Sequence, residues 1–141
     1  VNVVWMQICA QKAQSKLGCT VKIFDPTYMS KDIVKELGFG PVGHAEEVET
    51  SHMMARYPDM VHLEKAIDNP IKDTPLYSVD PTYEHDTLCY VPSTLEHAKA
   101  AAKKSGGCTG EPSKSDARRG QIYHNHLVKN LIAVVEQLQN A

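Results

Sequence analysis

The chain has 141 residues, of which 42% are hydrophobic and 23% charged, a composition typical of a globular domain with a core of its own. Fifteen Lys and Arg against seventeen Asp and Glu give a net charge of −2, without the basic stripe that nucleic-acid binding requires. No apolar run approaches the roughly 20 residues that cross a bilayer. We therefore expect no nucleic-acid partner and no membrane partner.

Cysteine usage points to a reducing compartment. Cys9, Cys19, Cys89 and Cys108 are scattered, with no close-paired spacing. This pattern argues against a thiolate zinc site and favours reduced thiols in a cytoplasmic protein. The first ten residues also lack the basic leader and small-residue cleavage site of a signal peptide.

The N-terminal part predicts a helix followed by a strand. Apolar spacing indicates a helix over residues 2–17 that stops at Gly18. Residues 19–25, CTVKIFD, are rich in β-branched and aromatic side chains and predict a strand. Helix and strand would form half of a parallel α/β unit, but a right-handed crossover also needs a strand before the helix, and none is present.

The middle of the chain predicts two short helices and a long irregular stretch. MSKDIVKELG, residues 29–38, reads as a helix capped by Ser30 and ended by Gly38. A second helix is expected from Ala45 to about Arg56. Proline-bearing pieces between residues 60 and 112 predict an excursion over the surface.

Two further helices are expected toward the C-terminus. STLEHAKAAAKKSGG predicts a surface helix with Ser93 as cap, Glu96 at the capping-box position and Gly106 as stop. The last helix, over 115–139 with Asp116 as N-cap, is amphipathic and is expected to cover one face of a sheet. Its apolar side consists of Tyr123, Leu127, Leu131, Val134 and Leu138.

Most histidines carry little functional signal. His124 and His126 are two residues apart, so on a helix they point in different directions and make a poor metal pair. His85 beside Asp86 is a weak His–Asp pair. Packed or interfacial histidines are the simpler interpretation of both pairs.

The segment GHAEEVETS, residues 43–51, carries the strongest candidate site. His44 follows a glycine-rich loop and precedes a helix start, where backbone N–H groups favour anions. Glu46, Glu47 and Glu49 fall in the first turn of that helix, where acidic residues need no other reason. A histidine near a glutamate can also form a proton-shuttling pair. The local pattern leaves both interpretations open.

A longer stretch, GHAEEVETSHMMARYPDMV, resembles the signature of the creatininase (creatinine amidohydrolase) family. The matching positions are His44, Glu47, Glu49, Thr50, Ser51, Pro58, Asp59 and Val61. Further on, GEPSKSDARRGQ resembles the family's approach to its terminal helix, through Gly110, Glu111, Pro112, Ala117 and Gly120. The resemblance covers the whole chain, most densely over residues 43–61.

This resemblance implies a three-layer α/β/α fold with a mainly parallel sheet, incomplete in this chain. Residues 1–141 would be the C-terminal part of a single creatininase-like domain. The family implies a hydrolase in which two divalent ions, zinc or manganese, activate water to attack a cyclic amide. His44 would position substrate and transfer protons with Glu49 nearby, and Gly43 and Glu46 would line the substrate site.

The metal ligands implied by the family are absent from these 141 residues. They come from an N-terminal Glu-x-His segment, a later aspartate and an Asn-Gly-His-x-x-Asn motif, none of which occurs here. We therefore expect no metal ligand in this chain and an N-terminal half supplied as a separate chain or a preceding segment. Relatives usually form multimers, so an oligomer is expected.

Departures from the signature leave the substrate open. Gly40 and Pro41 stand where creatininase has tryptophan and aspartate, so an aromatic flap over flat creatinine is missing. Glu46 replaces a small residue and adds charge beside the site. Two alternatives to amide hydrolysis remain: ring opening of a cyclic ketone in sugar or cyclitol metabolism, and a non-catalytic subunit or relative that keeps the fold.

Overall fold

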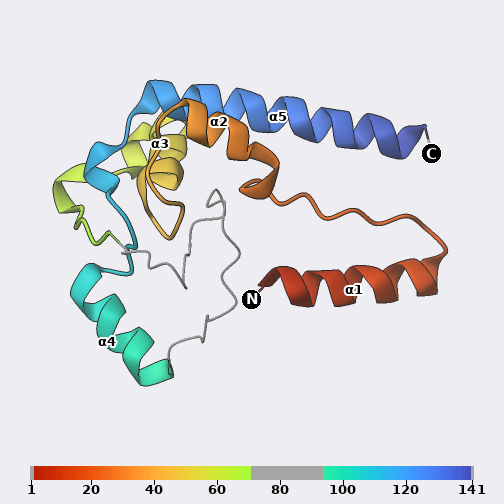
Figure 1. Ribbon diagram of the computed structural model, residues 1–141, viewed down its shortest axis with the longest axis horizontal. Coiled ribbons are helices and arrows are strands. Elements are labelled where there is room, and N and C mark those ends of the chain that lie inside the picture. Colours follow the sequence, from red (N-terminus) through yellow and green to blue (C-terminus); the bar gives the residue numbers. More distant parts are fainter. Residues whose placement is uncertain (1, 71–93, 141) are drawn as a thin grey trace.

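A computed structural model describes residues 2–70 and 94–140 of the chain, and these residues form a helical structure (Figure 1). The predicted helices are confirmed. Their bounds are α1 Asn2–Leu17, α2 Lys31–Glu36, α3 Glu47–Arg56, α4 Leu95–Ser105 and α5 Ala117–Gln139. Single turns of 3-10 helix lie at Tyr28–Ser30, Pro58–Met60, Leu63–Lys65 and Pro112–Lys114.

The expected three-layer α/β/α fold with a parallel sheet is wrong, because the described ranges contain no strand. Residues 19–25 instead form an extended link between α1 and α2 (Figure 1). Within this link the backbone N–H of Val21 donates to Oε1 of Gln14 on α1 at 2.8 Å, not to a neighbouring strand. A β-branched pattern gives a segment strand propensity, but a sheet also needs a partner backbone alongside it.

Some of the predicted helix caps have the expected chemistry and others do not. Ser30 lies at the N-cap position of α2, but its side chain makes no cap hydrogen bond, so the predicted Ser30 cap is wrong. Asp116 accepts the backbone N–H of Arg119 at 2.7 Å, and Gly106 ends α4 in the left-handed conformation at φ 64°. At the start of α4 the cap is Thr94, which accepts from the N–H of His97. The N3 position therefore belongs to His97 and not to Glu96, so the predicted capping box is wrong; Ser93 itself lies outside the described residues.

The two best-packed helices are α3 and α5, and α3 lies beside the N-terminal half of α5 (Figure 1). Their closest approach is at Gly120, where a Cβ atom would collide with the carbonyl group of Ser51. The Ser51 hydroxyl, fully buried, accepts the backbone N–H of Asp116 at 2.9 Å. Gly120 is therefore required by helix packing, and α5 packs on a helix where a sheet was expected.

A small hydrophobic core surrounds this helix pair. Ile33 and Val34 of α2, Val48 of α3 and Tyr123 of α5 are its buried members. Partly buried apolar side chains complete it, namely Leu37, Phe39, Val42 and Leu127. The far half of α5 lies beyond this core and exposes Val128, Leu131, Ile132 and Val135. No helix within the described ranges has the length and apolar character needed to cross a membrane.

Replacing each of two fully buried serines by alanine should have different effects on the free energy of unfolding. The Ser30 hydroxyl has no hydrogen-bond partner among the described residues, whereas the Ser51 hydroxyl accepts from Asp116. Ser30→Ala should leave the free energy of unfolding unchanged or raise it by up to about 1 kcal/mol, because it removes an unsatisfied buried polar group. Ser51→Ala should lower it by about 1–3 kcal/mol, because it removes the acceptor of the Asp116 N–H. Chemical denaturation of both variants measures the difference, and an equal loss in the two would contradict this account.

Candidate active site

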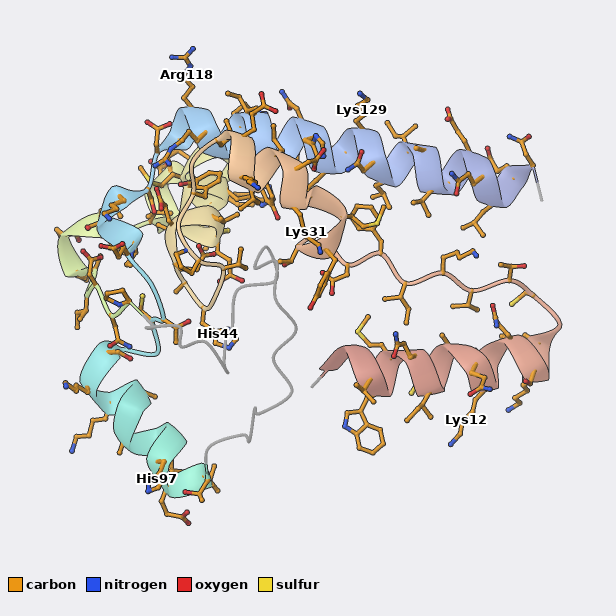
Figure 2. All side chains as sticks on the ribbon, in the orientation of Figure 1. Lys12, Lys31, His44, His97, Arg118 and Lys129 are labelled. Carbon is orange, nitrogen blue, oxygen red and sulfur yellow. The ribbon has the colours of Figure 1, made fainter. Side chains whose placement is uncertain are left out.

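His44 lies on the loop that leads into α3, on the side of the molecule away from α5 (Figure 2). Its side chain is exposed and makes no hydrogen bond to the described part of the chain. Its backbone, by contrast, is fixed on both sides by one residue. The N–H of His44 donates to Oγ1 of Thr109 at 2.7 Å, and its carbonyl accepts the N–H of Thr109 at 2.9 Å.

The next residue, Ala45, adopts a backbone conformation that is rare for a residue with a Cβ atom. Its φ is 48°, in the left-handed region that usually favours glycine. Oε2 of Glu49 accepts the N–H of Ala45 at 2.7 Å, and the hydroxyl of Thr50 donates to the Ala45 carbonyl at 3.3 Å. Strained backbone that surrounding bonds hold in place is often found at functional sites.

Glu46 caps α3 and is fully buried. Its two carboxylate oxygens accept the N–H groups of Val48 at 2.6 Å and Glu49 at 3.0 Å. Burial raises the pKa of Glu46 to about 7, although both backbone hydrogen bonds act in the opposite direction. Because both oxygens serve the cap, the structure gives Glu46 a structural task; its expected contact with substrate stays a prediction.

Glu47, which is buried, forms an ion pair with the partly exposed Arg119 of α5, at 2.6 Å between Oε1 and a guanidinium nitrogen. The other Glu47 oxygen accepts the N–H of Gly40 at 2.8 Å, and the guanidinium stacks over the ring of Phe39 at 4.7 Å. One carboxylate thereby connects the loop, α3 and α5. Sequence reasoning missed this pair, since 72 residues separate its members.

Segment 107–110 packs directly against the His44 loop. A Cβ atom on Gly43 would collide with Thr109, and one on Gly110 would lie 2.5 Å from Cβ of Glu46. The thiol of Cys108 faces the Ala45 carbonyl at 3.5 Å, and burial raises the pKa of this thiol. The close approach explains the glycines at both positions. It brings the predicted Gly43 and His44 together with Thr109, which carried no functional signal in the sequence.

Two cavities adjoin the first turns of α3. The larger, of about 410 Å³, lies beside Ala45, Glu49 and Thr50 and is otherwise walled mainly by apolar side chains of α3 and residues 60–67. The smaller, of about 200 Å³, lies between the loop and the α3–α5 pair and is lined by Glu46, Glu49 and His52 among others. Glu49 is a lining residue of both cavities.

A second histidine cluster joins α3 to α5. Nε2 of His52 lies 2.9 Å from Nδ1 of His124, and the His52 ring meets the Tyr123 ring edge-on. His126 points elsewhere, toward Asp32 at 3.2 Å, which confirms that His124 and His126 face different directions. The sequence analysis found no signal at His52, because its partner is distant in the chain. His85, Asp86 and Cys89 lie outside the described residues.

The described ranges do not fit a complete metal centre. They contain no group of three or more His, Cys, Asp or Glu side chains placed to hold an ion. The His52–His124 pair is joined nitrogen to nitrogen, as a hydrogen bond, and does not present two free lone pairs to a cation.

Comparison with known proteins identifies relatives. The family model for creatininase, described as creatinine amidohydrolase, matches residues 2–135. A creatinine amidohydrolase of Pseudomonas putida is 38% identical over 65 residues, which make up 46% of this chain and 24% of that protein. The matched part thus spans about a quarter of that relative. No solved structure matches the chain.

The His52–His124 contact predicts a pH-dependent stability. Burial, then the neighbouring His124 and Arg56, lower the pKa of His52 below its ordinary value of 6.5. The unfolded chain therefore binds a proton at His52 more readily than the folded chain does. This contribution to stability is present at higher pH and is lost as pH falls below 6.5 toward the folded-state value.

The His52→Asn variant should not show that loss. The unfolding free energy of the wild type minus that of the variant should therefore decrease as the pH is lowered from 7.5 to 5. Urea denaturation at a series of pH values measures it. His97→Asn, at an exposed position on α4, is the control and should show a constant difference. A His52 difference that does not change with pH would contradict the prediction.

Proposed function

Because this chain belongs to the creatininase family, we propose that it contributes the proton-transfer side of a hydrolase acting on a cyclic amide or related small cyclic substrate. The observation that carries the proposal is the exposed imidazole of His44 on a backbone that Thr109 holds at both its N–H and its carbonyl. The side chain is thus available to a substrate while its attachment point is fixed.

The chemistry follows from what an amide needs in order to break. The leaving nitrogen is a poor leaving group until it gains a proton, and histidine is the side chain best suited to supply one near neutral pH. In the proposed role His44 orients the substrate and donates this proton as the C–N bond breaks. Glu49, whose carboxylate accepts the N–H of Ala45 next to His44, is the proposed carboxylate partner and lines both cavities.

The family further implies two divalent ions, zinc or manganese. The described residues form no set of three ligands for such ions. We propose that their ligands belong to an N-terminal segment, in a separate chain or upstream of this one, and that the assembled enzyme is a cytoplasmic oligomer. The scattered cysteines and the family resemblance support these proposals.

The loop before His44 bears on the substrate. Gly40 donates its N–H to Glu47, and a Cβ atom at Gly40 would lie 3.2 Å from the same carboxylate. A large aromatic flap at this position would press on the Glu47–Arg119 pair. We therefore propose a substrate that does not depend on aromatic stacking from position 40, which favours a cyclic amide other than creatinine.

His44→Gln should abolish most of the activity of the assembled enzyme if the proton role is correct. Glutamine keeps a polar side chain of similar reach but cannot transfer a proton, so kcat should fall by about 10²- to 10⁴-fold. The measurement is hydrolysis of a panel of cyclic amides, creatinine included, with kcat and KM determined for wild type and variant. His97→Gln on α4 is the matched control and should keep wild-type kcat (Figure 2).

The same experiment separates an enzyme from a non-catalytic relative. Wild-type protein that binds these compounds without turnover, or a His44→Gln variant with unchanged kcat, would overturn the proposal.

A further inference from the structure

We propose that Thr109 is a positioning residue for His44, and that segment 107–110 sets the placement of the proton-transferring imidazole. This inference rests on the proposed function of His44. Thr109 reaches His44 across 65 positions of sequence. It uses a different atom for each of two bonds, so the contact fixes both the position and the direction of the His44 backbone.

The two bonds satisfy both polar groups of the His44 backbone. Oγ1 of Thr109 accepts from the His44 N–H at 2.7 Å, and the Thr109 N–H donates to the His44 carbonyl at 2.9 Å. The first bond needs the threonine hydroxyl, whereas any residue but proline can make the second. A side-chain substitution at position 109 therefore tests the first bond alone.

Without the bonds from Thr109, the backbone at His44 and Ala45 would be free to adopt a more favourable conformation. Ala45, the next residue, is held at φ 48°, and leaving the left-handed region would rotate His44 relative to α3. Glu49 holds this turn from the α3 side through the Ala45 N–H, and Thr109 holds it from the other side. His44 thus lies between two independent anchors.

Segment 107–110 is itself fixed, so it can serve as an anchor. Asn69 donates its backbone N–H to the carbonyl of Gly110 at 2.7 Å and its side-chain amide to the carbonyl of Cys108 at 3.0 Å. The Cys108 thiol also faces the carbonyl of Ala45 at 3.5 Å. Thr109 is held between two residues with bonds of their own, which limits how far it can move with the loop.

Thr109 also packs closely against the backbone of the loop that carries His44. Gly43 has no room for a Cβ atom because Thr109 occupies that space. Valine at position 109 would fill nearly the same volume as threonine but would present a methyl group to the His44 N–H. The substitution therefore removes the acceptor of the His44 N–H and keeps the packing. The loop should then shift so that this N–H can find another partner.

The predicted effect is on the chemical step. A displacement of about 1 Å in a reacting group can cost about 10²-fold in rate. Thr109→Val in the assembled enzyme should therefore lower kcat by about 10- to 100-fold and change KM by less than about threefold. Thr109→Ser keeps the hydroxyl and should restore kcat to within about threefold of wild type.

Thr94→Val provides the matched control. Thr94 also accepts a backbone N–H, that of His97 at 3.3 Å, but it does so at the start of α4, away from His44. This variant should lose some thermal stability and keep wild-type kcat and KM. A purely structural role of Thr109 would make Thr109→Val behave in the same way.

A readout that does not depend on turnover completes the test. The ring C–H resonances of His44 in proton–carbon NMR spectra, assigned with His44→Gln, should shift or broaden in Thr109→Val and return in Thr109→Ser. Unchanged resonances together with unchanged kcat in Thr109→Val would overturn the inference. If His44→Gln is fully active the proposed function fails, whereas if only Thr109→Val is fully active the positioning role alone fails.

Discussion

The close contact between α3 and α5 determines where the first turn of α3 and the loop before it lie. The two helices approach until the Gly120 backbone meets the carbonyl of Ser51, and the Ser51 hydroxyl binds the first turn of α5. Beside this contact, Glu47 pairs with Arg119 and also binds the N–H of Gly40. A partly buried ion pair of this kind contributes more to geometry than to net stability, because desolvation offsets most of the attraction. Here its geometry fixes the start of α3.

The candidate site is built outward from that start. Glu46 caps the first turn, Glu49 reaches back to the Ala45 N–H, and Thr109 holds His44 from the opposite side. Three carboxylates in one helical turn would repel one another, but each has a partner that reduces the repulsion. The N–H groups of the helix start favour negative charge, Arg119 neutralises Glu47, and the pKa of Glu46 rises to about 7 through burial. Among His44, Glu46, Glu47 and Glu49, only His44 has an exposed side chain that makes no hydrogen bond to the described part of the chain.

Sequence reasoning succeeded for most local features, although the Ser30 cap and the capping box at Glu96 were wrong, and it failed for contacts between distant parts of the chain. The helical segments, the Asp116 cap and the Gly106 stop each depend on a few neighbouring residues, and all are confirmed. The strand at residues 19–25 was wrong because its own composition could not reveal whether another backbone would lie beside it. The acidic cluster after His44 was ambiguous in sequence, and the structure resolves it into a cap and an ion pair with Arg119.

The contacts that matter most to the site were not predictable by spacing. Thr109 and His44, Glu47 and Arg119, and His52 and His124 each lie more than 60 residues apart. The sequence feature that did indicate these close contacts was the position of certain glycines. Gly43, Gly110 and Gly120 each stand where another part of the chain comes too close for a Cβ atom. Glycines beside a candidate histidine therefore indicate close packing, although they do not identify the partner.

The most direct test of this account is a double-mutant cycle between Glu47→Gln and Arg119→Met, followed by unfolding free energy and by amide hydrogen exchange at Val48 and Glu49. If the ion pair fixes the start of α3, the coupling energy should be at least about 1 kcal/mol. Each single variant should also speed exchange of these two amides, which bind the Glu46 cap. Additive effects with unchanged exchange would show that the start of α3 forms without the pair, and would contradict the account.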